Sequence, residues 1–129
     1  MTNNDSNRIT DSYCRKFYYP AESIPTKDLL VDFLKSTKDW DGLGVSKDYL
    51  ILANNYQNVS KLANNLRVAR SRIRQGMRAD KKSVPAFRFT TVILRVSEPN
   101  ENGYSEYILT LGKANSVASS NKQLLEELL

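Results

Sequence analysis

Histidine is absent from the 129-residue sequence, and cysteine occurs once, at Cys14. Without an imidazole the chain lacks Ser-His-Asp and Cys-His nucleophilic sites, histidine general bases and most zinc sites. Asp39 and Asp41 stand two positions apart, which is more typical of a helix end or a loop than of a metal site. A lone thiol cannot form an internal disulfide and indicates a reducing, cytoplasmic setting. We therefore expect no enzyme activity and no cofactor.

Long hydrophobic runs are also missing. The longest, residues 49–53, falls far short of the ~20 residues that cross a bilayer, so we expect no membrane partner. The first residues have neither the basic region nor the apolar region of a secretory signal. We interpret residues 1–12 as a flexible polar tail and residues 13–129 as a single domain, because the length and the 40% hydrophobic content are typical of one globular domain.

Acidic residues are scarce in one part of the chain. Residues 61–82 contain eight Lys and Arg residues and one acid, Asp80, so this segment carries a net charge of +7, whereas the whole chain carries +5. Solvated helices usually mix the two signs, because i,i+4 ion pairs stabilise them. Such asymmetry is typical of a surface that binds a polyanion. The alternative is a solvated helix face whose arginine stems cover apolar surface.

The basic segment has two structural interpretations, and the first is one continuous helix from about Val59. An apolar stripe at spacings of three and four is then formed by Leu62, Leu66, Ala69, Ile73 and Met77. A cationic stripe beside it is formed by Arg67, Arg70, Arg74 and Arg78. Arg72 and Lys61 fall on the other flank, so both sides of the buried face are cationic.

The second interpretation is two helices. The stretch LANNLRVARSRI resembles the helix-turn-helix motif, because Ala63, Val68 and Ile73 stand where that motif places its small and branched packing residues. It departs at Arg67, where the motif usually has glycine, and at Ala69, where it usually has a Ser or Thr cap. With the hairpin that follows, the order is similar to that of winged-helix DNA-binding domains. The resemblance implies a recognition helix that brings to the major groove Arg70, Ser71, Arg72 and Arg74.

The rest of the chain predicts a small α+β domain. Residues 27–38 form an amphipathic helix, because apolar residues recur at helical spacing: Leu29, Leu30, Phe33 and Leu34. Residues 13–19 suggest a short strand that buries Phe17 and Tyr19 on one face. Residues 49–53 are either a short strand or a helical turn, since five residues do not decide the period.

Two β-rich runs, residues 86–98 and 104–112, surround a glycine-containing turn and predict a hairpin or small antiparallel sheet. The first strand places Val92, Leu94 and Val96 on one face and Phe89 and Ile93 on the other, which suggests cover on both sides. The second strand has an inward row of Tyr107, Leu109 and Leu111. A short C-terminal helix, with a Ser120–Gln123 capping box, carries four leucines that pack on their own domain or on a second copy as a homodimer: Leu124, Leu125, Leu128 and Leu129.

These patterns favour a small intracellular nucleic-acid-binding protein, with duplex DNA favoured over RNA, that acts by binding in regulation, such as transcription regulation. The expected contact residues are Arg67, Arg70, Arg72, Arg74, Arg78, Lys81 and Lys82. A version that binds RNA would expose the aromatic residues of segment 13–19 as stacking platforms. The alternative function is a protein-binding adaptor or inhibitor that docks an acidic partner surface.

Overall fold

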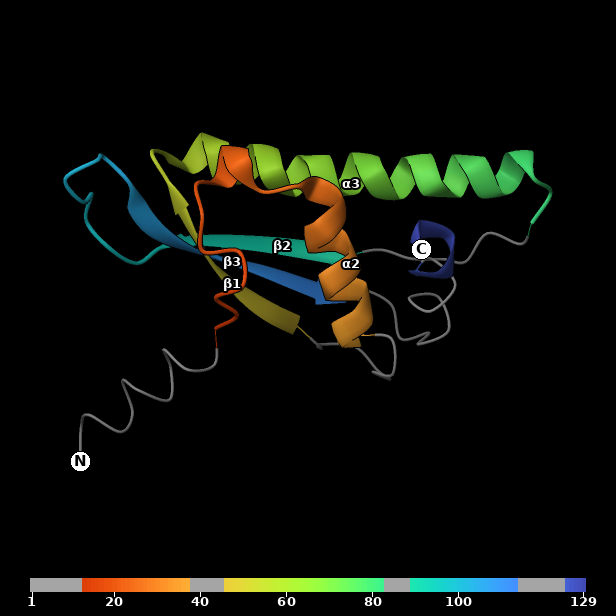
Figure 1. Cartoon of the computed structure of the whole chain (residues 1–129), viewed down its shortest axis with the longest axis horizontal. Coiled ribbons are helices and arrows are strands. Elements are labelled where there is room, and N and C mark those ends of the chain that lie inside the picture. The colour runs from red at the N-terminus through yellow and green to blue at the C-terminus, as the bar shows by residue number, and fades with distance from the viewer. Residues whose placement is uncertain (1–12, 38–45, 83–88, 114–124) are drawn as a thin grey trace, which may run out of the picture.

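The computed structural model describes residues 13–37, 46–82, 89–113 and 125–129. The chain folds into a three-stranded antiparallel sheet with helices on one of its faces (Figure 1). In chain order the elements are η1 (Ala21–Ser23), α2 (Thr26–Thr37), β1 (Ser46–Ala53), α3 (Tyr56–Ala79), β2 (Phe89–Arg95) and β3 (Ser105–Lys113). Residues 125–128 add one helical turn. The predicted α+β class, long basic helix and small antiparallel sheet are confirmed. The tail expected at residues 1–12, the Asp39–Asp41 pair and the Ser120–Gln123 capping box lie outside the described residues.

The strand order is β1-β3-β2, with β3 antiparallel to both neighbours. The predicted hairpin joins β2 to β3, and Gly103 adopts φ 81° in its turn, a conformation that favours glycine. Residues 46–53 form a strand, which decides between the two alternatives left open by their pattern. Because β1 and β2 lie at opposite edges and run parallel, their connection must cross the sheet, and α3 lies in that connection.

The core lies between the sheet and the helices. From α2 it takes the four apolar residues predicted for it, Leu29, Leu30, Phe33 and Leu34, each at most 1% exposed. The sheet contributes its alternate residues, Tyr49, Ile51, Tyr107, Leu109 and Leu111. From α3 come Val59, Leu62, Ala63, Leu66 and Met77. Alternate residues of the strands and helically spaced residues of α2 and α3 therefore meet in one apolar layer. On the other face of the sheet, the paired residues Leu50 and Ile108 are buried as well.

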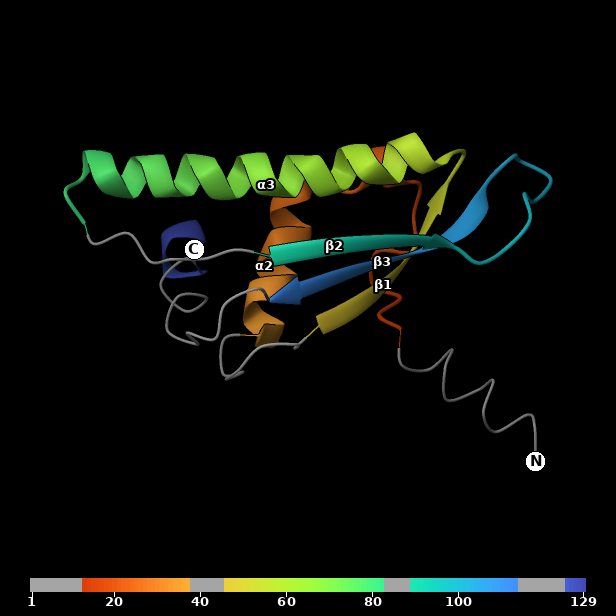
Figure 2. The same ribbon diagram turned by 180° about the vertical axis from the view of Figure 1, so that it is seen from behind.

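The opposite face of the sheet carries no described helix (Figure 2). Val92 is 61% exposed, Leu94 58% and Val96 45%, so the expectation that the first hairpin strand is covered on both sides is wrong for the described residues. The reason is topological: η1, α2 and α3 all contribute to the core layer on the other face. No described residue pairs with the outer edge of β2, whereas residues Cys14 and Pro20 bridge to the outer edge of β1.

Two further expectations need correction. In the N-terminal segment Phe17 is buried, but Tyr19 is 55% exposed, because a turn closed by the Tyr18 N–H and the Arg15 carbonyl interrupts the alternation of a strand. At the C-terminus Leu125 is buried in the core and Leu128 packs partly against it, as expected, whereas Leu129 is 77% exposed.

Candidate nucleic-acid interface

The candidate interface is α3, a single helix of 24 residues with six basic side chains and no acidic one. Asn55 begins it, because its side-chain oxygen accepts a hydrogen bond from the Asn58 N–H at 2.9 Å. At 1.5 Å per residue the helix is about 36 Å long. It lies along one side of the molecule, and no described element lies beyond it in either view (Figures 1 and 2).

The helix-turn-helix alternative is wrong. Residues 56–79 are helical without a break, and Arg67, which would occupy the turn, lies in the middle of α3. The apolar residues on both sides of the supposed turn, Leu62 and Leu66 before it and Met77 after it, are all buried along one continuous face. Val68 points outward and is 40% exposed, so it does not pack as the motif requires.

The stripe of Arg67, Arg70 and Arg74 is half-buried, in contrast to the exposed row of phosphate-binding residues expected from the sequence. Val59 and Ala63 are buried and lie next to these arginines around the helix, so the inward side of α3 includes the arginine stripe. The Arg67 Nη2 atom donates a hydrogen bond to Thr91 Oγ1 on β2 at 2.8 Å. The Nε atoms of Arg70 and Arg74 are inaccessible to solvent. These three side chains therefore line the side of α3 that faces the sheet and the core.

The other predicted contact residues are exposed: Arg72, Arg78, Lys81 and Lys82. Arg78 and Lys81 stand together at the C-terminal end of α3, where Lys81 has φ 58°. Lys82 forms an ion pair with Glu127, 2.8 Å away, and this hydrogen bond raises the pKa of Lys82. Because Lys82 is already paired within the chain, Arg72, Arg78 and Lys81 are the better-placed cations.

The outward side of α3 also presents residues that the charge pattern did not single out: Gln57, Lys61, Asn64, Asn65 and Gln75, all exposed. With Val68 and Arg72 they lie within about 100° of arc opposite the buried face, at 100° per residue. The signal was present in the sequence, because these positions repeat at spacings of three and four on the side away from the apolar stripe. The amide side chains carry no charge, so the charge pattern does not reveal them.

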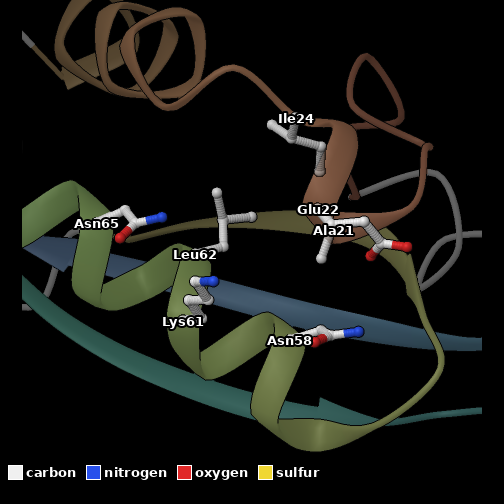
Figure 3. A pocket seen from close by; sticks show the side chains of 7 residues that line it. All are labelled: Ala21, Glu22, Ile24, Asn58, Lys61, Leu62 and Asn65. Carbon is white, nitrogen blue, oxygen red and sulfur yellow. The ribbon is translucent and has the colours of Figure 1, made fainter.

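A hollow of about 230 Å³ lies between η1 and the N-terminal half of α3 (Figure 3). It is lined by Ala21, Glu22, Ile24, Asn58, Lys61, Leu62 and Asn65. The Glu22 carboxylate places a negative charge on this side of the helix, where it disfavours a phosphate. A similar hollow between the start of α2 and α3 brings Lys27 beside Val68 and Arg72, so the positive side of the interface lies farther along α3.

A second polar cluster joins α2 to β1. Asp32 Oδ2 accepts hydrogen bonds from Lys47 Nζ and Tyr49 Oη, each at 2.7 Å, and Lys47 also donates to Ser36 Oγ at 2.6 Å. Burial by itself raises the pKa of the Asp32 carboxyl, but the hydrogen bonds from Lys47 and Tyr49 outweigh it, so the pKa is lowered. Burial, together with the bond to Asp32, raises the pKa of Tyr49. Because these groups satisfy one another, we interpret the cluster as a link between two elements.

No three potential metal ligands cluster among the described residues. In the same part of the chain, each helix is too short or too polar to cross a bilayer. Comparison of the chain with family models, with curated proteins and with solved structures found no match.

Proposed function

We propose that this protein is a small intracellular nucleic-acid-binding regulator, for example of transcription, that binds duplex DNA through the exposed side of α3. The observation that carries the proposal is a 24-residue helix on the outside of the fold with six cations and no acid. A phosphate approaching this side meets cations and amides along its length. Exposed acids border this surface: Asp80 caps the C-terminal end of α3, and Glu22 lines the hollow beside its N-terminal half.

The exposed cations Lys61, Arg72, Arg78 and Lys81 contact the nucleic acid in this proposal. Phosphates are contacted by Lys61, Arg78 and Lys81. Arginine suits this role because its planar guanidinium stays charged and donates to two phosphate oxygens at once. The half-buried Arg67, Arg70 and Arg74 lie on the inward side of α3 and increase the positive potential at its exposed side. Their charges act over about 8–10 Å at physiological salt. Their contribution is to attraction more than to direct contact.

Duplex DNA is favoured over a single strand because the cations lie on one straight, projecting helix, the shape that enters a major groove. Single strands are usually bound by aromatic platforms. Tyr18 and Tyr19 are 40% and 55% exposed, but they follow the outer edge of β1, and the Tyr18 hydroxyl is held by Glu106 at 2.9 Å. These rings are not part of the α3 surface.

The test is a binding curve on duplex DNA, single-stranded DNA and duplex RNA at several salt concentrations. Each phosphate contact on B-DNA contributes about −0.9 to the slope of log affinity against log salt. The variant Arg78→Gln/Lys81→Gln should bind duplex DNA more weakly on every sequence, with a slope shallower by about two units. The control, Arg15→Gln/Lys35→Gln, removes the same charge from exposed positions off α3 and should keep the parent slope.

Failure of the parent protein to bind any of the three nucleic acids would overturn the proposal. The second candidate, a protein-binding adaptor, would then be favoured, and one observation supports it. Strand β2 combines an unpaired edge, among the described residues, with the exposed apolar residues Val92 and Leu94, and the exposed Val96 follows it directly. Such an edge can accept a strand from a partner.

A further inference from the structure

We infer that the outward side of α3 reads base edges in a major groove, with Asn64, Val68 and Arg72 as the reading residues. The inference rests on the proposed function and adds to it the class of site: a short sequence that contains adenine, thymine and guanine. It concerns residues that differ from the phosphate-binding cations at the end of the helix.

The three residues stand four positions apart and form one line along the middle of the exposed side. Asn64 and Arg72 are exposed, and Val68 between them is 40% exposed. The line is about 12 Å long at 1.5 Å per residue, which matches three to four base pairs at about 3.4 Å each. Because the major groove curves around the duplex, a straight helix contacts bases only over a short length. We therefore place the base contacts at the centre of α3.

Their chemistry is complementary to base edges in three different ways. An asparagine amide donates to and accepts from adenine N6 and N7, and a guanidinium donates to guanine O6 and N7. An exposed branched side chain contacts the C5-methyl group of thymine. Val68 interrupts an otherwise polar surface, and a thymine methyl gives this exposed apolar group a partner. Within the part of the chain that the structure describes, the side chains of Asn64 and Arg72 have no hydrogen-bond or ion-pair partner that would compete.

Steric access supports the same assignment. Asn64, Val68 and Arg72 are exposed, and the residues flanking the line are themselves polar, Lys61 toward one end and Gln75 toward the other. On one flank η1 and the start of α2 form hollows with α3. Lys27 at the start of α2 lines a hollow with Val68 and Arg72, so a cation stands beside the reading line where the DNA backbone would pass. The charge along α3 is therefore complementary to a duplex, with amide and apolar groups at its centre.

The test begins with selection of bound duplexes from a random DNA library by the parent protein. The expected result is enrichment of a motif of three to four base pairs with adenine, thymine and guanine. Base analogues then identify the partners of each side chain. Replacing the selected thymine by deoxyuridine removes only its methyl group and should weaken parent binding by about three- to fivefold, the worth of one buried methyl. The variant Val68→Ala should be insensitive to that replacement.

Arg72 and Asn64 are tested in the same way. Replacing the selected base by 7-deazaguanine or 7-deazaadenine removes its N7 acceptor. Parent binding should weaken by about two- to tenfold, because one of the two hydrogen bonds of the bidentate contact is lost. The variants Arg72→Ala and Asn64→Ala should each lose sensitivity to one of the two analogues. The control variant Asn102→Ala removes an exposed amide from the hairpin turn and should show the parent's response to all analogues.

The outcomes separate the inference from the proposed function. Salt-dependent binding of duplex DNA without an enriched motif would overturn base reading and leave nucleic-acid binding in place. An enriched motif whose analogue effects persist unchanged in the three variants would overturn the assignment of these residues. Binding of single strands or RNA alone would overturn the major-groove site, and failure to bind any nucleic acid would overturn both.

Discussion

Replacing Asp32 by alanine removes the carboxylate that joins α2 to β1. The change takes away hydrogen bonds from Lys47 Nζ and Tyr49 Oη, both 2.7 Å long. Hydrogen bonds to charged groups contribute about 1.5–3 kcal/mol each. The Lys47 share is smaller, because its side chain is 23% exposed and it keeps its bond to Ser36. Tyr49 is 0% exposed, so its hydroxyl is left inside the fold without this acceptor.

We expect Asp32→Ala to lower the free energy of unfolding by about 2–3 kcal/mol. For a domain of this size the melting temperature should fall by about 7–11 °C. Thermal and urea unfolding followed by circular dichroism measure both quantities. The control is Asp28→Ala, which removes an exposed acid from the same helix and should cost at most about 1 kcal/mol through the helix dipole.

A double-mutant cycle with Tyr49→Phe isolates the bond between the two side chains. The double variant should be more stable than the sum of the two single effects predicts, by about 1 kcal/mol. Strict additivity, or an Asp32→Ala cost equal to that of Asp28→Ala, would refute the interpretation of the cluster as a stabilising link.

The stabilising effect of Asp32 should also depend on pH. Its pKa is lower in the folded chain than the ordinary value of about 3.9 in an unfolded one. A group of this kind contributes stability above its unfolded pKa and loses it as the pH falls through its folded pKa. The difference in stability between the parent and Asp32→Ala should therefore be constant from about pH 7 to pH 5 and should shrink below about pH 4. A difference that grows at low pH would contradict the direction of the shift.

Three further changes test other parts of the structure. Gly103→Val should cost about 1–2 kcal/mol of stability, because a branched residue is strained at φ 81°, and an unchanged melting temperature would contradict the turn. Arg74→Met should be as stable as the parent, because it keeps an apolar side chain for packing and removes a buried Nε. Arg74→Ala should lose about 1–2 kcal/mol of stability. Equal loss in both variants would show that the charge itself is needed. Deleting residues 125–129 should lower the melting temperature without changing the oligomeric state, because Leu125 is buried in its own chain. A change from dimer to monomer in solution would indicate the homodimer instead.

Much of the local structure could be predicted from the sequence because local forces produce it. The hairpin followed from two alternating runs around a glycine turn, and α2 followed from four apolar residues at helical spacing. The inward row of β3 was correct for the same reason. The cationic segment was also recognised as helical, but its bounds were not. Asn55 begins α3 three residues earlier than the apolar pattern suggested, because its cap is a side-chain hydrogen bond that periodicity does not reveal.

The composition of the candidate site could be predicted, but the side of α3 that faces outward could not. The apolar stripe and the arginine stripe are neighbours on the helix, and arginine stems are themselves apolar enough to be covered. The burial of Val59 and Ala63 turned α3 so that Arg67, Arg70 and Arg74 are half-buried. This choice depends on what stands opposite the helix, here α2, η1 and the sheet.

By itself, the sequence determined the α+β class, the hairpin, the amphipathic helices and the concentration of positive charge in one segment, since each depends on residues close together in the chain. Only the tertiary structure decided that α3 is continuous, that Asn64, Val68 and Arg72 lie on its open side, and that Val92 and Leu94 are left uncovered. Those features depend on which distant segments share a face, and the packing of η1, α2 and α3 in one layer settled all of them together.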